Sequence, residues 1–203
     1  MIVDFIFDVA SPNAYLAHRV IPDFEKRTGT TFNYIPCLLG GIHKLTNNQP
    51  PFVAFAEIKN KSDYQIIELE RFVKQHKLDK YKFNSHFPPS TIQIQRGAIA
   101  AKELGVFEQY IECVLVAMWE NDKNLSDIEV LKETLNENDF DVNAIIEIVT
   151  SQACKDELIK NTDEAVSRGA FGVPTFFLNE QIFFGKDHLH QLEEYIYLSL
   201  IHI

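Results

Sequence analysis

Residues 2–35 contain the pattern that most constrains the fold: a strand, a helix and a second strand in close succession. Residues 2–8 are mostly β-branched and aromatic, which predicts a strand. Residues 15–28 carry apolar side chains at helical spacing, and Gly29 is suited to end that helix. Residues 31–35 alternate and predict a second strand. Two strands joined through a helix are expected to lie parallel, with a right-handed crossover.

The middle of the chain is predicted to be helical. From about residue 38 to residue 168, apolar residues recur with a period near 3.6 between short polar breaks. The break at residues 83–90 contains Pro88 and Pro89 and is predicted to be a loop. The expected helices are Ser62–His76, Thr91–Leu104, Phe107–Asn121, Asp127–Asn136, Asn143–Thr150 and Gln152–Ser167.

Strand patterns return only near the end of the chain, at residues 175–178 and 181–184. Asn179 and Glu180 between them suit a two-residue hairpin turn, and a final helix is expected from about residue 187 to 200. The predicted fold class is therefore α/β, with a four-stranded sheet (βαβ…ββα) interrupted by an all-helical insertion. We expect residues 1–45 plus 169–203 to form one domain and residues 46–168 to form the helical insertion domain.

Composition excludes several classes of partner. The 203 residues carry a formal net charge of −10, and phosphate binding needs clustered Lys and Arg, so no nucleic-acid partner is expected. No apolar run approaches the roughly 18 residues of a membrane helix, so no membrane partner is expected. Cys37, Cys113 and Cys154 lack disulfide or zinc spacing, so no metal site is expected. This cysteine usage, without a signal-peptide pattern, predicts a cytoplasmic protein.

Ser11 stands where the first strand meets the first helix. Serine is a favoured helix N-cap and Pro12 suits the first helical position, which gives a purely structural interpretation. The alternative is functional, because a hydroxyl at a helix N-terminus can stabilise a thiolate and lower the pKa of a thiol. The surrounding sequence lacks a nucleophile elbow, which argues against a serine hydrolase.

Two segments near the C-terminus each have a structural and a ligand-binding interpretation. Val173-Pro174 is either a loop that enters an edge strand or a cis peptide that presents the backbone of Val173 to a peptide ligand. Asp187, after Gly185 and Lys186, is either an N-cap or first-turn residue of the last helix, or part of a ligand site. In the second case the helix N-terminus would receive the α-carboxylate of a γ-glutamyl group, and Asp187 its ammonium.

These motifs together resemble the 2-hydroxychromene-2-carboxylate isomerase family, a DsbA-like branch of the thioredoxin superfamily close to the kappa-class glutathione transferases. The resemblance covers essentially the whole chain and implies a thioredoxin-like domain interrupted by a helical lobe. The residues that carry it are Phe7-Asp8, Ser11-Pro12, Tyr15-Leu16-Ala17, Leu38-Leu39-Gly40-Gly41, Asn48, Pro50-Pro51, Lys61, Tyr64, Arg71, Phe87-Pro88, Arg96, Phe171-Gly172-Val173-Pro174-Thr175, Gly185 and Asp187.

The resemblance implies glutathione as the cofactor, a small aromatic electrophile as the substrate, and a homodimer. Thioredoxin-like proteins often carry a Cys-x-x-Cys pair at the first strand-to-helix corner, but this chain has Ser11 and Ala14 there and cannot form that disulfide. Ser11 matches the residue that faces the glutathione sulfur. Val173 matches the residue that precedes a cis proline, here Pro174, and pairs with the cysteinyl backbone.

The resemblance implies two further groups of site residues. Lys186 and Asp187 match the turn that binds the γ-glutamyl group, and Asn48 and Lys61 match polar residues that line the cleft. The chain departs from the family pattern at Ser90 and at three positions expected near the second-substrate pocket, Asn13, Cys37 and Asn47.

The preferred hypothesis is a glutathione-dependent isomerase. A kappa-class-like glutathione transferase would use the same glutathione site and release the conjugate instead. A non-catalytic DsbA-like protein that binds thiols or peptides is the alternative from another class. A disulfide oxidoreductase fits least, because neither Ser11 nor Ala14 can form the disulfide bond.

Overall fold

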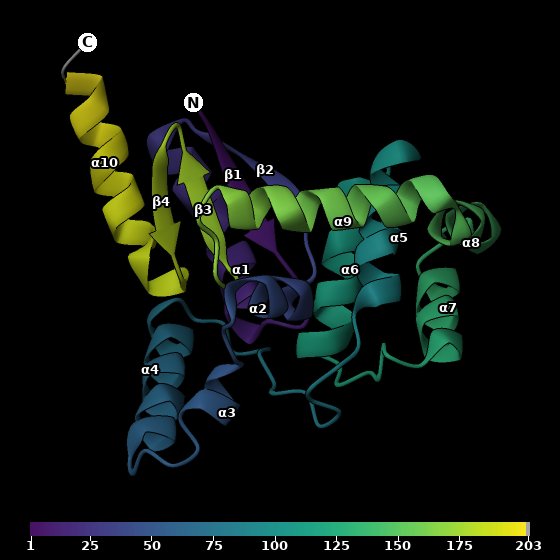
Figure 1. The fold of residues 1–203 in the computed structure, drawn as a ribbon, viewed down its shortest axis with the longest axis horizontal. Coiled ribbons are helices and arrows are strands. Elements are labelled where there is room, and N and C mark those ends of the chain that lie inside the picture. Colours follow the sequence, from purple (N-terminus) through teal and green to yellow (C-terminus); the bar gives the residue numbers. More distant parts are fainter. Residues whose placement is uncertain (202–203) are drawn as a thin grey trace.

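The computed structural model describes residues 1–201, which form a four-stranded sheet with helices on both faces (Figure 1). The elements are β1 (Ile2–Phe7), α1 (Pro12–Thr28), β2 (Thr31–Pro36), α2 (Leu39–Thr46), α3 (Pro51–Ala54), α4 (Lys61–Gln75), α5 (Ile92–Glu103), α6 (Phe107–Trp119), α7 (Ile128–Glu137), α8 (Val142–Thr150), α9 (Gln152–Ser167), β3 (Thr175–Leu178), β4 (Gln181–Phe184), the 3₁₀ turn η1 (Lys186–His188) and α10 (Leu189–Ile201).

The sheet has the strand order β2-β1-β3-β4. β1 and β2 are parallel, as their connection through α1 predicts, whereas β3 is antiparallel to β1 and to β4. Asn179 in the β3–β4 turn has a φ of 55°, a left-handed conformation that asparagine tolerates. The predicted α/β class, its βαβ…ββα order and the helical insertion are all confirmed.

Two apolar cores lie on opposite faces of the sheet because successive strand residues point to opposite sides. Val3, Phe5 and Phe7 of β1 belong to the larger core, which also contains buried residues of α1 and α10. Ile6 of β1 belongs to the smaller core, with Ile42 of α2 and residues next to and within α9. The sheet is therefore covered by α1 and α10 on one face and by α2 and α9 on the other.

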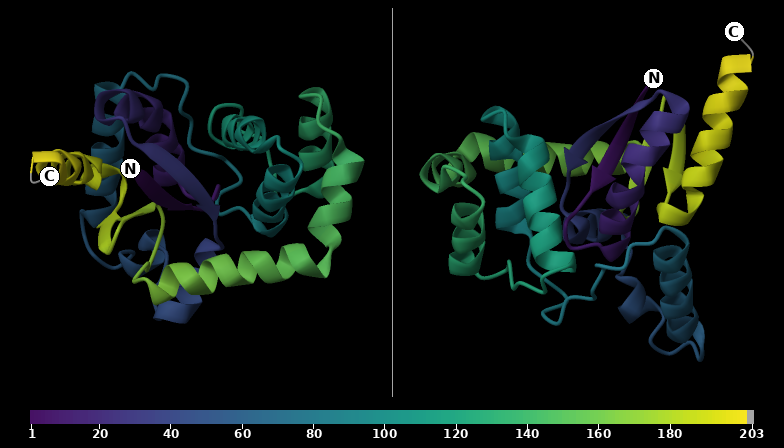
Figure 2. Two further views of the ribbon diagram at one scale, coloured as in Figure 1. Left: turned by 90° about the horizontal axis from the view of Figure 1, so that it is seen from above. Right: turned by 180° about the vertical axis from the view of Figure 1, so that it is seen from behind.

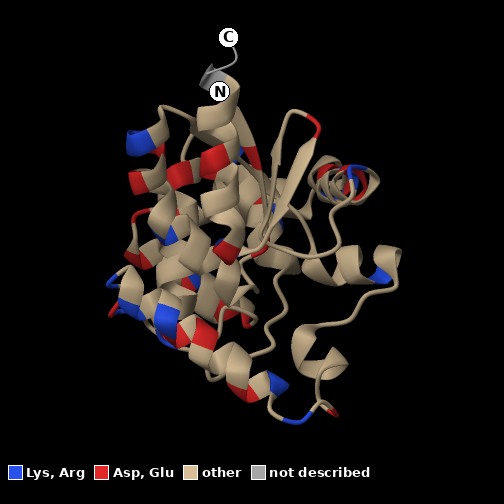
Figure 3. Ribbon diagram, turned by 90° about the vertical axis from the view of Figure 1, so that its left-hand side faces the viewer, with Lys and Arg blue, Asp and Glu red and all other residues tan. Residues whose placement is uncertain are grey.

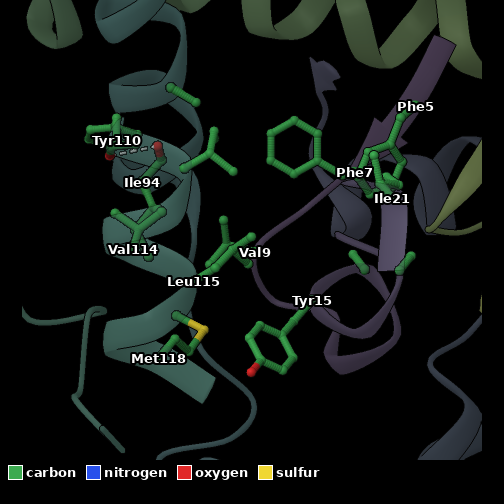
Figure 4. Close-up of a cluster of buried hydrophobic side chains, with 14 of the residues drawn as sticks. Phe5, Phe7, Val9, Tyr15, Ile21, Ile94, Tyr110, Val114, Leu115 and Met118 are labelled. Carbon is green, nitrogen blue, oxygen red and sulfur yellow. Dashed lines mark hydrogen bonds between the residues drawn. The ribbon is translucent and has the colours of Figure 1, made fainter. Parts of the chain in front are cut away.

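Helices α5 to α9 pack on one another beside the sheet, and we call them the helical lobe. The larger core continues from the sheet into this lobe. Figure 4 shows side chains of β1 and α1, among them Phe7 and Tyr15, facing those of α6. Helix α9 runs from the outer end of the lobe back to the sheet (Figure 2). The lobe and the sheet thus share one core on this side.

Helices α3 and α4 project away from both the sheet and the lobe (Figure 1). Most of α4 is exposed, and its one fully buried side chain is Phe72. The insertion therefore contains a packed part, α5 to α9, and a projecting part, α3 to α4. The proposed boundaries of the two domains, residues 1–45 plus 169–203 and residues 46–168, stay a prediction.

The beginning of the last helix differs from the prediction. Residues 186–188 form a 3₁₀ turn, and α10 begins only at Leu189. Asp187 is therefore inside this turn and is not the N-cap of α10. The turn follows Gly185, whose φ of 87° favours glycine and redirects the chain after β4.

Within residues 1–201, no helix is both long enough and apolar enough to cross a bilayer. Acidic and basic residues alternate over the face that contains α10 and the β3–β4 hairpin (Figure 3).

Candidate active site

Ser11 is the N-cap of α1. Its Oγ accepts a hydrogen bond from the backbone N–H of Ala14 at 3.3 Å, and Pro12 takes the first helical position. The structural interpretation of Ser11 is thereby confirmed. Ser11 is 5% exposed, and its hydroxyl lies 3.4 Å from the carbonyl oxygen of Val173, to which it donates. The helix N-terminus and the loop before β3 therefore meet at this hydroxyl.

The Val173-Pro174 peptide bond is cis, as predicted. The prediction that both backbone groups of Val173 face outward is wrong for the carbonyl, because that oxygen accepts the hydrogen bond from Ser11. Within residues 1–201, the backbone N–H of Val173 has no hydrogen-bond partner. A backbone N–H without a partner in the chain can donate to a ligand that brings a carbonyl oxygen.

The loop of residues 171–174 brings most of the predicted site together. The backbone N–H of Gly185 donates to the carbonyl oxygen of Pro174 at 2.9 Å, which places the η1 turn beside the cis peptide. Asn48 donates from Nδ2 to the carbonyl oxygen of Phe171 at 2.8 Å. Three predicted segments, which contain Ser11, Asn48 and Lys186-Asp187, therefore converge on the loop that contains the fourth, Val173-Pro174.

Lys61 does not join this convergence through any contact in the described structure. It is exposed at the first position of α4, and its Nζ lies 3.8 Å from the centre of the Phe55 ring. Its predicted role in lining the cleft stays a prediction.

Lys186 and Asp187 form an ion pair with each other. The Lys186 side chain is only 3% exposed, and its Nζ lies 2.5 Å from Oδ2 of Asp187. The ammonium also lies 4.9 Å from the centre of the Phe72 ring, which joins the η1 turn to α4. The Asp187 side chain is 44% exposed, so its carboxylate is open to a ligand ammonium while it neutralises Lys186.

Asp8, just before this corner, is a residue whose importance the sequence analysis missed. Its buried carboxylate accepts hydrogen bonds from the backbone N–H of Ala10 at 2.9 Å and of Leu39 at 2.8 Å. Burial raises the pKa of Asp8, and these hydrogen bonds oppose that effect. The available signal was a charged residue at the end of an apolar strand, three positions before a helix N-cap.

The electrostatics of the corner suit an anionic group. The first turn of α1, residues 12–15, contains no acidic side chain that would neutralise the positive end of the helix dipole. A thiolate placed beside Ser11 would meet both that dipole and a hydroxyl donor. The corner thus combines a helix N-terminus with a hydroxyl that donates to Val173 in this structure, and residues 8–15 contain no cysteine.

The three cysteines of the chain are free thiols in apolar surroundings. Burial raises the pKa of all three, that of Cys113 to about 11. Cys37 was expected near the second-substrate pocket, and this stays a prediction, but its thiol does not face an open surface. Its side chain is fully buried in the smaller core, and its Sγ lies 3.3 Å from the carbonyl oxygen of Asn161 in α9.

A cavity of about 300 Å³ opens elsewhere, between β2 and helices α5 and α9. Its lining includes Tyr34, Lys102 and Arg168 but none of the predicted site residues. Convergence of the predicted segments, not cavity size, therefore defines the candidate site.

Comparison with known proteins agrees with this geometry. A family model for the DSBA-like thioredoxin domain matches residues 2–197. A 2-hydroxychromene-2-carboxylate isomerase of Sphingobium xenophagum is 30% identical, over 96% of this chain and 97% of its own. Glutathione S-transferase kappa 1 of Rattus norvegicus is 22% identical, over 94% of this chain and 88% of its own.

Among solved structures, that of a 2-hydroxychromene-2-carboxylate isomerase matches with a TM-score of 0.84 at 24% identity, and covers 98% of this chain and 96% of that one. Fold, family model and full-length relatives therefore agree. The chain belongs to the DsbA-like thioredoxin family and, within it, to the 2-hydroxychromene-2-carboxylate isomerase family.

Proposed function

We propose that this protein is a glutathione-dependent isomerase that acts on an aromatic electrophile of the 2-hydroxychromene-2-carboxylate type. The observation that carries the proposal is the Ser11 corner, where a hydroxyl at the N-terminus of α1 contacts the carbonyl oxygen of Val173, a residue whose backbone N–H has no partner within residues 1–201. Relatives named glutathione S-transferase kappa support glutathione as the cofactor, and relatives named isomerases support the type of reaction.

The residues of the site fit the three parts of glutathione. The N–H of Val173, before Pro174, would pair with the cysteinyl backbone as an added strand does. Asp187 would accept the γ-glutamyl ammonium, and the buried Lys186 would hold that carboxylate in place. Asn48, already fixed to the loop through Phe171, and Lys61 would contribute polar groups at the edge of the cleft.

Bound glutathione would supply a thiolate nucleophile, which adds reversibly to an electrophilic carbon and is eliminated after bond rotation, so that it is returned unchanged. Ser11 would donate its hydroxyl hydrogen to the sulfur, and to do so it would turn away from the carbonyl oxygen of Val173. The positive end of the α1 dipole would act in the same direction. The chain thereby lowers the pKa of a thiol that it does not itself provide.

A kappa-class-like transferase is the second candidate, because relatives with that name match the full chain. The two activities differ in whether the conjugate is released. Purified protein is incubated with 2-hydroxychromene-2-carboxylate, with and without glutathione, and the products are separated and weighed by mass spectrometry. We expect an isomer of unchanged mass that forms only with glutathione. A stable product heavier by one glutathione would favour the transferase, and isomerisation that does not need glutathione would overturn the proposal.

We also propose that the protein is a homodimer. Large apolar side chains are exposed on α2, at Leu45, and along the projecting segment of α3 and α4: Phe52, Val53, Ile58, Tyr64, Ile66 and Ile67. An apolar surface of this kind marks an interface more often than a free surface. Sedimentation equilibrium tests the proposal, and a monomer at micromolar concentration would overturn it. The three free cysteines support a reducing compartment, and we propose the cytoplasm.

A further inference from the structure

We propose that Gln95 and Trp119, two buried residues of the helical lobe, are positioning residues that hold the Ser11 corner in the orientation needed to stabilise a thiolate. This inference rests on the proposed function. It assigns the lobe a part in setting the acidity of the bound thiol, beyond its part in the core.

The two residues bind one peptide segment from opposite sides. Gln95 of α5 accepts from the backbone N–H of Val9 at 3.4 Å through Oε1. Trp119 of α6 donates from Nε1 to the carbonyl oxygen of Val9 at 2.9 Å. Both lobe side chains are fully buried. Both polar groups of Val9, two positions before Ser11, are therefore held by the lobe.

Gln95 also fixes the ends of two strands. Its Nε2 donates to the carbonyl oxygens of Phe7 and Cys37, each at 2.9 Å. These residues lie at the end of β1 and just after β2. The amide of Gln95 thus uses its acceptor and both donors on the backbone around the corner, which leaves it no freedom to turn.

The rest of the turn is closed by its own residues. The carbonyl oxygen of Asp8 accepts from the N–H of Ser11 at 3.0 Å, and its carboxylate accepts from the N–H of Ala10. These bonds make the turn from Asp8 to Ser11 a rigid unit. Two other bonds tie this turn to α2 and to the loop before β3, from the N–H of Leu39 to the Asp8 carboxylate and from the Ser11 hydroxyl to the carbonyl oxygen of Val173. The Val9 bonds to Gln95 and Trp119 are the ones that set its orientation relative to the helical lobe.

Orientation matters here because hydroxyl hydrogen bonds are short and directional. A small rotation of the rigid turn moves the Ser11 Oγ relative to the Val173 N–H that would bind the cysteinyl backbone, and the sulfur follows that backbone. Ion pairs from His18 and Arg19 to Glu112 join α1 and α6 farther along α1, whereas the bonds of Gln95 and Trp119 act on the backbone of the turn itself. The lobe therefore sets the distance between the hydroxyl and the sulfur.

The test compares Trp119→Phe with Tyr110→Phe. The first removes the donor to Val9, whereas the control removes a hydrogen bond of 2.9 Å from Tyr110 to Ile94 that joins the same two helices away from the corner. The pKa of bound glutathione is followed by thiolate absorbance, and affinity by calorimetry. We expect Trp119→Phe to raise the pKa of the bound thiol by about 1 unit and to lower kcat more than it changes KM. We expect Tyr110→Phe to leave the pKa of the bound thiol and the kcat as in the wild type.

A second variant approaches the corner from α5. Gln95→Met keeps the length of the side chain but removes its three hydrogen bonds, and we expect it to raise the thiol pKa in the same way. Equal thiol pKa values in the wild type, Trp119→Phe and Gln95→Met would overturn the inference. Amide NMR of the protein without glutathione separates this failure from that of the proposed function. We expect the Ser11 and Ala14 signals to shift in Trp119→Phe but not in Tyr110→Phe, and unshifted signals would also overturn the inference.

Discussion

The hydroxyl of Ser11 donates a hydrogen bond to the carbonyl oxygen of Val173 across 3.4 Å, although the two residues are 162 positions apart in the sequence. This contact joins the first helix to the loop before the third strand. It also leaves the Ser11 oxygen as the cap of α1, through the N–H of Ala14. The Ser11 side chain thus caps α1 and holds it against the loop before β3. The same side chain faces the place where a ligand sulfur is proposed to lie.

Ser11→Ala separates these two roles when it is compared with Ser151→Ala. Ser151 caps α9 through the N–H of Cys154 at 3.1 Å, away from the site. Each variant is expected to lower the free energy of unfolding by about 1 kcal/mol, measured by urea denaturation. Only Ser11→Ala is expected to raise the pKa of bound glutathione, followed by thiolate absorbance. If both variants titrate like the wild type, Ser11 is a helix cap and nothing more.

Thiolate absorbance near neutral pH reports bound glutathione and not the cysteines of the protein. Burial raises the pKa of Cys37, Cys113 and Cys154, so none of them contributes a thiolate near neutral pH. A thiolate signal that appears in that range on addition of glutathione therefore belongs to the ligand.

Ser11→Cys is expected to produce a reactive thiol without producing a disulfide catalyst. The new thiol would stand at a helix N-terminus, which lowers its pKa, but Ala14 provides no partner for an internal disulfide. Insulin reduction by Ser11→Cys is compared with that by the double variant Ser11→Cys/Ala14→Cys. Equal turnover by the two variants would contradict the explanation that disulfide exchange fails because Ala14 provides no second thiol.

Asp8→Asn is expected to destabilise the protein by about 1–3 kcal/mol, because one buried N–H loses its acceptor. The two carboxylate oxygens accept from Ala10 and Leu39, and an amide would turn an NH₂ group toward one of these donors. Asp163→Asn, on the exposed face of α9, is the control and is expected to change stability little. Equal denaturation midpoints for the two variants would show that the Asp8 hydrogen bonds add no stability.

Acid is expected to weaken the contact between α1 and α6. The hydrogen bond with His18, together with Arg19, lowers the pKa of Glu112 to about 2. A carboxylate whose pKa is lowered by folding stabilises the protein above its unfolded pKa, and that stabilisation is lost as the pH falls from about 5 to about 2. The Glu112 side chain is half exposed, so solvent screening keeps the effect modest.

Glu112→Gln should therefore reduce the loss of stability over this pH interval, measured by urea denaturation at a series of pH values. Glu147→Gln removes an exposed carboxylate of α8 that forms no ion pair within residues 1–201, and it should leave the profile unchanged. If the stability of the wild type and that of Glu112→Gln fall equally with pH, the ionised Glu112 does not contribute the acid-sensitive stabilisation.

Local patterns were enough to predict the parts of the fold that local chemistry determines. The βαβ unit, the hairpin and the Ser11 cap each depend on residues that are close in sequence, and each is confirmed. The cis Val173-Pro174 bond followed from its glycine-bracketed position and the family resemblance. The second cis bond, Phe87-Pro88, lies in a segment that was predicted only as a loop.

What the sequence did not reveal depends on packing between distant segments. The bonds of Val9 with Gln95 and Trp119 join residues 86 and 110 positions apart, and only the docking of the lobe brings them together. Cys37 was expected near a pocket because of its position in the family pattern, and the sequence did not reveal that its side chain, just after β2, points into the smaller core. The direction of a side chain after a strand depends on the register of that strand, which periodicity alone does not fix.

Titration of the wild-type protein with reduced glutathione by isothermal calorimetry, under reducing conditions, tests the central claim most directly. We expect saturable binding of one glutathione per chain, with perturbed amide NMR signals at Ser11, Val173 and Asp187. S-methylglutathione, which cannot form a thiolate, should bind more weakly, because Ser11 and the dipole of α1 favour the anion. The absence of heat and of signal changes at millimolar glutathione would contradict the account.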